Sequence, residues 1–307
     1  MGKIAFVFPG QGAQAVGMGK DAYESHAAAR AVFDHADEVL GFSLSKLAFD
    51  GPDEELRQTA NTQPALLATS IALLEMYKET KVKPDFVAGH SLGEYSALVA
   101  AGVLTFDDAL RLVRLRGQFM ERAVPGGQGA MAAVLGAERE ALQGLCASIT
   151  ANSGLVELAN VNCPGQIVVS GSANGVAELV ERGKEAGAKR VIPLDVSGPF
   201  HSSMMQPAAD LLSEELSKVT FNSALVPVIA NVHASPVTSG EELRELLVKQ
   251  VVSPVLWEDT IRYLIGEGVD TFVEIGSGTV LAGLIKKIDK SVQVISVNSA
   301  EAAAVAL

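Results

Sequence analysis

The sequence has few cysteines, few basic residues and no long apolar run, which argues against several protein classes. Its 307 residues include only two cysteines, Cys146 and Cys163, which suit neither a metal site nor a disulfide framework. Basic residues are outnumbered, 24 against 36 acidic ones, and the formal net charge of −12 argues against nucleic-acid binding. These shortages predict a protein of a reducing compartment, the cytoplasm, without a metal site.

Long apolar runs are also missing. The run IAFVF before Pro9 is too short for a signal peptide, and the longest later run, ALVAAGVL at 97–104, is far below the length of a membrane span. The chain shows no internal repeat. With 48% hydrophobic residues it can nevertheless bury a large core, in one domain or in two.

A glycine-rich loop, FPGQGAQAVGMGK at 8–20, follows the first apolar run and raises the possibility of a phosphate-binding loop. It fails both common nucleotide-binding patterns. Lys20 is followed by Asp21 where a P-loop needs Ser or Thr, and Ala15 stands where a dinucleotide fingerprint needs its third glycine. A strand-to-helix turn without a nucleotide remains the interpretation of this loop.

Short apolar strands alternate with helical stretches along most of the chain. IAFVF is followed by helices to about residue 80, and then by the strand DFVAG and a long helical stretch from Leu92 to about Ala123. This alternation indicates an α/β fold with a largely parallel sheet.

The pattern changes between two glycine- and proline-containing breaks, PGGQG at 125–129 and SGPF at 197–200. Between them the expected order is β-α-β-β-α-β, that of a ferredoxin-like module. We therefore predict a small ferredoxin-like domain, 128–196, inserted into a large α/β-hydrolase-like domain made of 1–127 and 197–307. Clefts between domains are favoured ligand sites.

The strand DFVAG runs directly into Gly89-His90-Ser91-Leu92-Gly93, which matches the G-x-S-x-G nucleophile elbow. A serine on such a sharp turn presents its oxygen above the sheet edge, and the helix that begins there points free N–H groups at a developing oxyanion. Ser91 is therefore the candidate nucleophile.

A serine nucleophile needs a base, and the chain has five histidines. His26 and His35 lie in polar helical stretches that read as solvated surface, and His90 adjoins the serine, so that its side chain points elsewhere on the turn. His201, in SGPFHSS, and His233, in NVHASP, remain. His201 is preferred because it lies where the chain re-enters the large domain beside the expected cleft.

Arg116 lies on the wrong face of its helix for a solvated charge. In FDDALRLVRLRGQFMERA, Arg111 and Arg114 fall on the polar side, whereas Arg116 shares a face with four apolar residues, Ala109, Leu112, Val113 and Met120. A buried guanidinium stays charged and is costly unless it is paired. Its partner is either a carboxylate of this chain or a carboxylate of the substrate, held by two parallel hydrogen bonds.

These motifs together identify a family. GQGAQ at 10–14, GHSLGE at 89–94, the Arg116 helix, GPFHS at 198–202 and Gln250-Val251 occur in order along nearly the whole chain. The chain resembles the malonyl-CoA:acyl carrier protein transacylases of fatty-acid synthesis, with no departure at a motif position.

The resemblance implies a role for each motif residue. Ser91 would be acylated by the malonyl group, His201 would act as general base, and the backbone carbonyl of Gln250 would orient the imidazole in place of an acid. The N–H groups of Gln11 and Leu92 would form the oxyanion hole, which explains the glycine-rich loop without a phosphate.

The resemblance also implies the substrates. Arg116 would bind the free carboxylate of malonyl, and Phe200 occupies a position where related enzymes that prefer malonyl carry Phe. The expected substrates are malonyl-CoA and an acyl carrier protein bearing a phosphopantetheine thiol, with no cofactor. No obligate interface is indicated, so we expect a monomer.

Acyl carrier proteins are acidic, as this chain is, so their encounter needs a local basic patch. The candidates are Lys189, Arg190, Lys286, Lys287 and Lys290, although each could equally be a solvated surface residue.

Three other hypotheses about the function remain open from the sequence. A serine esterase or thioesterase could use the same elbow, and Asp195 lies between Ser91 and His201 in the order that α/β-hydrolases require. The second is a trans-acting acyltransferase of a polyketide pathway. The third is a non-catalytic scaffold, which the intact Ser91, His201 and Arg116 disfavour.

Overall fold

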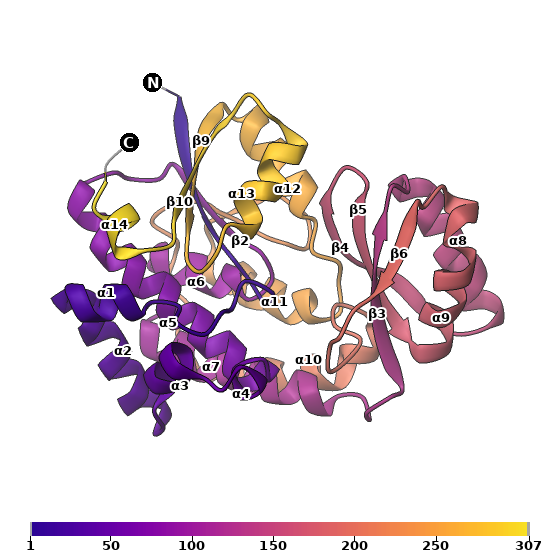
Figure 1. Cartoon of the computed structure of the whole chain (residues 1–307), viewed down its shortest axis with the longest axis horizontal. Helices are drawn as coiled ribbons and strands as arrows, with labels where there is room; N and C mark the ends of the chain where they lie inside the picture. The colour runs from indigo at the N-terminus through magenta and orange to yellow at the C-terminus, as the bar shows by residue number, and fades with distance from the viewer. Residues whose placement is uncertain (1, 306–307) are drawn as a thin grey trace.

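The computed structural model describes residues 2–305, so residue 1 and residues 306–307, the ends of the predicted large domain, lie outside it. Figure 1 shows two bodies of secondary structure side by side, each built on its own sheet. None of the helices within 2–305 is both long and apolar enough to cross a membrane.

The larger sheet is mostly parallel. Its strand order is β10-β9-β1-β2-β7-β8, and only the terminal pair, β7 with β8, is antiparallel. The strands are β1 (Lys3–Phe8), β2 (Phe86–Gly89), β7 (Val228–Ile229), β8 (Pro236–Val237), β9 (Val269–Ile275) and β10 (Gln293–Val297).

Helices cover both faces of this sheet, because its central strand is apolar on both sides. Phe6 and Phe8 of β1 pack into the core formed with α2, α5 and α7, whereas Ala5 and Val7 pack on the opposite face against α12 and α13. The elements of this part are α1 (Lys20–Ser25), α2 (Ala27–Leu40), α3 (Leu44–Asp50), α4 (Asp53–Leu56), α5 (Thr59–Tyr77), η1 (Lys78–Thr80), α6 (Gly93–Ala100), α7 (Phe106–Arg122), η3 (Ser203–Met205), α10 (Gln206–Leu216), α11 (Gly240–Val251), α12 (Trp257–Gly266), α13 (Val280–Ile288) and α14 (Ala300–Ala303).

The smaller sheet is antiparallel, with the order β4-β5-β3-β6. Helices α8 and α9 pack on one face of it around a separate core (Figure 1). Its elements are β3 (Gly129–Leu135), α8 (Arg139–Asn152), β4 (Val156–Cys163), β5 (Gln166–Ser172), α9 (Ala173–Arg182), η2 (Gly183–Ala186) and β6 (Arg190–Pro193). This order confirms the predicted fold class, a parallel α/β body with an inserted βαββαβ module.

The small sheet is tied to the large body by main-chain hydrogen bonds. The N–H of Val161 in β4 donates to the carbonyl of Val255 over 2.9 Å, and the N–H of Val255 donates to the carbonyl of Ala159 over 2.8 Å. These bonds hold β4 where Asn162 can reach His90, the residue that follows β2.

The single helical stretch expected from Leu92 to Ala123 was wrong, since it is two helices, α6 and α7. Gly102, with φ 72°, adopts the left-handed conformation that ends a helix. Thr105 then caps α7 by accepting a hydrogen bond from the N–H of Asp108 over 3.1 Å. The break lets α7 turn back and carry Arg116 toward the end of β2.

Candidate active site

Ser91 lies on the turn between β2 and α6, with φ 51°, a left-handed conformation unusual for a serine. The turn is possible because backbone packs directly on backbone around it. A Cβ added to Gly89, Gly93 or Gly10 would collide with main-chain atoms of a neighbouring segment. Gly10 belongs to the glycine-rich loop, so this loop lies against the serine turn.

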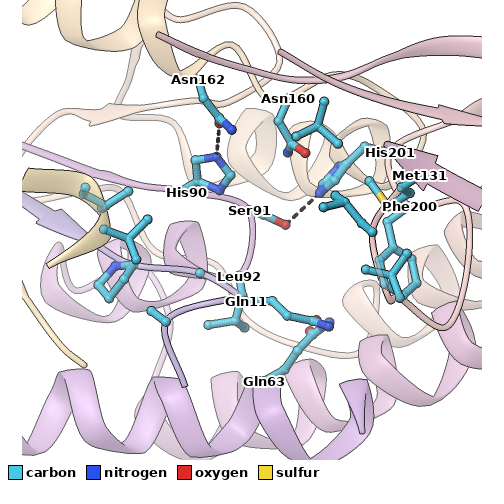
Figure 2. A pocket seen from close by; sticks show the side chains of 18 of the residues that line it. Gln11, Gln63, His90, Ser91, Leu92, Met131, Asn160, Asn162, Phe200 and His201 are labelled. Carbon is cyan, nitrogen blue, oxygen red and sulfur yellow. Dashed lines mark hydrogen bonds between the residues drawn. The ribbon is translucent and has the colours of Figure 1, made fainter. Parts of the chain in front are cut away.

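The Ser91 hydroxyl is hydrogen-bonded to His201, with 2.8 Å between Oγ and Nε2 (Figure 2). The other ring nitrogen of His201, Nδ1, lies 2.9 Å from the main-chain oxygen of Gln250. Because a carbonyl can only accept, Nδ1 carries the proton and Nε2 is free to take one from the serine. Gln250 lies in the last turn of α11, where carbonyls lack helical partners and carry the negative end of the helix dipole.

No carboxylate takes the position of the third, acidic member of a catalytic triad beside Ser91 and His201 within residues 2–305. Asp195, the residue that could have made a Ser-Asp-His order, is exposed and makes no hydrogen bond to His201 within residues 2–305. His233 is exposed as well, so it is excluded as the base for Ser91. The histidine that contacts the serine is the one that the sequence preferred.

Burial and the nearby positive charge of Arg116 lower the pKa of His201 to about 3. The imidazole is only 4% exposed, and its hydrogen bond to Gln250 opposes this lowering of the pKa. His201 is therefore neutral at physiological pH, the protonation state that a general base needs.

Arg116 is 1% exposed and makes no ion pair with any carboxylate within the described residues. Its Nη1 donates to Oε1 of Gln63 over 2.9 Å, and its Nη2 donates to Oε1 of Gln250 over 2.9 Å and to Oγ of Ser91 over 3.2 Å. Nε has no partner. The sequence left two possible partners for Arg116, a carboxylate of this chain and a carboxylate of the substrate. Direct pairing with a carboxylate of this chain is excluded within the described residues.

Asn231 clamps the serine turn. Its Oδ1 accepts from the Ser91 N–H over 2.7 Å, and its Nδ2 donates to the carbonyl of Gly89 over 2.6 Å. Its own N–H donates to Oε2 of Glu94 over 3.1 Å. These contacts bridge the two sides of the elbow and hold Ser91 in its left-handed conformation.

Gln11 and Leu92, the two expected oxyanion-hole residues, both line the cavity at Ser91 (Figure 2). Within residues 2–305, the main-chain N–H of neither donates a hydrogen bond to another protein group. The side chain of Gln11 is held by Thr59, with 3.2 Å between Nε2 and Oγ1. Two N–H groups beside the serine are therefore available to a ligand.

A cavity of about 220 Å³ opens at Ser91 between the large and the small sheet. Figure 2 shows Phe200 and Met131 on the His201 side of it, and Asn160 and Asn162 of β4 across from the serine. Phe200 is buried and lines the cavity wall, and its role in acyl selectivity stays a prediction. Within residues 2–305 no group of three His, Cys, Asp or Glu side chains could hold a metal ion.

The His90 ring makes no hydrogen bond to Ser91 within the described residues, but it lines the same cavity and its Nε2 lies 2.8 Å from Oδ1 of Asn162 (Figure 2). His26 and His35, which the sequence predicted to be solvated surface residues, both make hydrogen bonds within the protein. His26 caps α2 through its Nδ1, and His35 joins α2 to Asp107 of α7 over 2.7 Å.

Arg114 was wrongly expected to be a solvated charge. It is half-buried, donates to the carbonyl of Ala60 over 2.6 Å and to Oδ1 of Asn61, and lies over the ring of Phe42. Helix periodicity places it away from the apolar stripe, but α5 packs on that side of α7 as well. Arg111 is exposed, as expected.

Sequence reasoning missed Gln63, Glu94 and Asn231. Glu94 had a visible signal, because it is the only charged residue in the apolar helix GEYSALVA and is 1% exposed. Gln63 and Asn231 are neutral polar residues in apolar surroundings, a pattern that many structural residues share.

We expect the reactivity of Ser91 to stay constant from pH 7 down to about pH 5, since His201 is protonated only near pH 3. The measurement is the rate at which an uncharged phosphonate labels Ser91, with His233→Ala as a control that leaves the profile unchanged. A rate that falls with a midpoint near 6.5, the ordinary value for histidine, would contradict the buried neutral base.

Comparisons with known proteins agree with this geometry. The model of a family described as "Acyl transferase domain" matches residues 5–305. The chain is 56% identical to the malonyl CoA-acyl carrier protein transacylase of Bacillus subtilis, over 98% of this chain and 95% of that one.

Two solved structures are also similar. The crystal structure of an acyl carrier protein S-malonyltransferase from Vibrio cholerae is 46% identical over 97% of both chains, with a TM-score of 0.94. A malonyl-transacylase solved in complex with its type II PKS acyl-carrier protein is 42% identical over 98% of this chain and 97% of that one, with a TM-score of 0.95. The chain therefore belongs to the acyl transferase family, among its malonyl CoA-acyl carrier protein transacylases.

Proposed function

We propose that the chain transfers the malonyl group from malonyl-CoA to the phosphopantetheine thiol of an acyl carrier protein, through a malonyl ester on Ser91, and so supplies fatty-acid synthesis. Membership of the transacylase family supports this activity. Cys146 and Cys163 are free and buried, which favours a reducing compartment, the cytoplasm. The site is complete within one chain, which favours a monomer.

The observation that carries the proposal is the buried charge of Arg116 beside Ser91. Its guanidinium is held only by neutral oxygens, and its Nη2 reaches the serine hydroxyl itself. A free carboxylate two carbons from the reacting carbonyl, as in malonyl, can pair with the guanidinium while its thioester lies at Ser91. An acetyl group leaves the charge unpaired, and sites of this kind reject such substrates by about 10⁴ or more.

The first half-reaction loads the enzyme. Ser91 Oγ attacks the thioester carbonyl while His201 Nε2 takes the hydroxyl proton, and the N–H groups of Gln11 and Leu92 hold the negative oxygen. The C–S bond then breaks, and the imidazolium returns the proton to the departing thiolate, so that coenzyme A leaves as its thiol. The Gln250 carbonyl stabilises the imidazolium in between.

The second half-reaction is the reverse with a new thiol. His201 takes the proton of the phosphopantetheine thiol, and the thiolate attacks the ester carbonyl. The bond between the acyl carbon and Ser91 Oγ then breaks, and the imidazolium returns the proton to the serine oxygen. A thioester is exchanged for a thioester, so the overall reaction is close to thermoneutral and reversible. Because water could replace the thiol, the apolar wall formed by Met131, Phe200 and their neighbours protects the ester.

Hydrolysis is the competing activity at the same serine. A general esterase has no use for a buried cation in its acyl pocket, and the Asp195 that an α/β-hydrolase triad would need is exposed. A carrier protein of a polyketide pathway is the alternative acceptor, since one structural neighbour was solved with such a protein.

The proposal predicts a single malonyl adduct on Ser91. Intact-protein mass spectrometry after brief mixing with malonyl-CoA should show it in the wild type and not in Ser91→Ala. Addition of acyl carrier protein should discharge the adduct much faster than water does. No adduct, or one lost to water as quickly as to the thiol, would replace the transacylase with a hydrolase.

We propose that the carrier protein docks at the turn between β4 and β5. Lys287 lies at this turn, because its Nζ donates over 3.2 Å to Gln166, which lines the cavity. Lys189 lies beside the same turn, next to Gly136, whose N–H donates to the carbonyl of Gly165. Lys286, its neighbour on α13, is directed elsewhere, since its Nζ donates to the main-chain oxygens of Lys290 and Val292. Lys287 and Lys189 can reverse the field of the acidic chain beside this turn.

Charge reversal tests this dock. We expect Lys287→Glu to raise the KM for acyl carrier protein about tenfold at low salt, and much less for free pantetheine as acceptor. The effect should shrink at high ionic strength. Lys46→Glu on α3 makes the same change in net charge away from the cavity and should have no such effect. Equal losses with both acceptors would mean that Lys287 is not part of the dock.

A further inference from the structure

Glu94 is a buried carboxylate that reaches the active site only through other side chains. It lies in the first turn of α6, three residues after Ser91, and is 1% exposed. Its Oε2 accepts from the amide Nε2 of Gln250 over 2.9 Å and from the N–H of Asn231 over 3.1 Å. Within residues 2–305 it forms no direct ion pair with Arg116.

Gln250 connects this carboxylate to the cation. An amide side chain has one donor end and one acceptor end. Because Nε2 points to Glu94, and also to the carbonyl of Ser91 over 3.1 Å, Oε1 must face the other way, where it accepts from Nη2 of Arg116. A flipped amide would place its NH₂ group against the guanidinium.

We propose that Glu94 is a positioning residue that sets specificity. Through Gln250 it holds Arg116 toward the cavity, and its own charge decides how much of the guanidinium charge is left for the carboxylate of the incoming acyl group. This inference rests on the proposed malonyl transfer and adds a residue to it.

The separation of the two charges by an amide has a consequence for binding. A carboxylate in direct contact would neutralise Arg116 and fill the place that a substrate carboxylate needs. Held one side chain further away, Glu94 still attracts the guanidinium but leaves its Nη atoms on Gln63, Gln250 and Ser91. The two carboxylates then share one cation, so each weakens the other when both are ionised.

The protonation state of Glu94 therefore affects how strongly Arg116 binds the substrate carboxylate. Burial raises the pKa of Glu94 to about 7, against the opposing effects of Asn231, Gln250 and Arg116. The other ionisable groups that act on this cluster titrate elsewhere, since the pKa of His201 is lowered and that of Tyr95 is raised. As the pH rises through 7, Glu94 becomes ionised and competes with malonyl for Arg116.

The test compares malonyl-CoA with acetyl-CoA, which lacks the carboxylate, as substrates of the same variant. In the wild type we expect the ratio of their kcat/KM values to fall about tenfold between pH 6 and pH 8.5. Glu94→Gln keeps the shape and an acceptor oxygen but cannot ionise, so its ratio should not depend on pH. Glu94→Ala removes the shortest of the three hydrogen bonds that hold the Gln250 amide and leaves those to the Ser91 carbonyl and to Oδ1 of Asn231. Its ratio at pH 6 should be about tenfold lower than that of the wild type.

A second buried carboxylate supplies the matched control. Glu274 of β9 is fully buried and accepts two main-chain N–H groups, those of Leu281 and Ala282, but contacts neither Gln250 nor Arg116. Glu274→Gln should keep both the wild-type ratio and its dependence on pH.

Two results would overturn the inference. One is a Glu94→Gln enzyme whose malonyl-to-acetyl ratio still falls with pH as in the wild type. The other is a Glu94→Ala enzyme that loses malonyl and acetyl transfer by the same factor, as a merely structural residue would. Failure of the proposed function is distinct, because the wild type itself would then form no malonyl ester on Ser91.

Discussion

The active site depends on one buried positive charge. Arg116 is almost completely enclosed, yet its hydrogen-bond partners are the neutral oxygens of Gln63, Gln250 and Ser91. Burying a cation without a counter-ion in direct contact costs several kcal/mol, which these bonds and the ring of Tyr95 offset only in part. In the function proposed above, a substrate that brings its own carboxylate relieves the remaining cost, and this is the physical basis of the proposed preference for malonyl.

The charge of Arg116 also affects the protonation of His201, the general base. Arg116 and burial together keep His201 neutral, while the Gln250 carbonyl fixes which nitrogen carries the proton. Gln250 thus serves both groups, the imidazole through its main chain and the guanidinium through its side chain. Ser91 and His201 both have positive φ, 51° and 58°, so two strained turns bring the pair together, one from each side of the inserted module.

Much of this was predictable because the chemistry resides in local patterns. The alternation of strands and helices predicted both sheets, the elbow motif predicted Ser91, and helix periodicity predicted a buried Arg116. The sequence could not place Asn231 or Gln63, because the contacts that give them meaning join segments 140 and 53 residues away. The Gln250 carbonyl that binds His201 was predicted only from the family resemblance, because a main-chain carbonyl cannot be recognised from the residue type. Arg114 was wrongly predicted to be solvated because a second side of α7 is also covered.

The most direct test of the account is the substrate preference of Arg116→Ala. If the guanidinium exists to pair with the malonyl carboxylate, kcat/KM for malonyl-CoA should fall by about 10³ or more, while that for acetyl-CoA should change little or rise. The malonyl-to-acetyl preference would then be lost. If both substrates lose activity by the same factor, Arg116 supports the serine turn and the buried charge does not select the substrate.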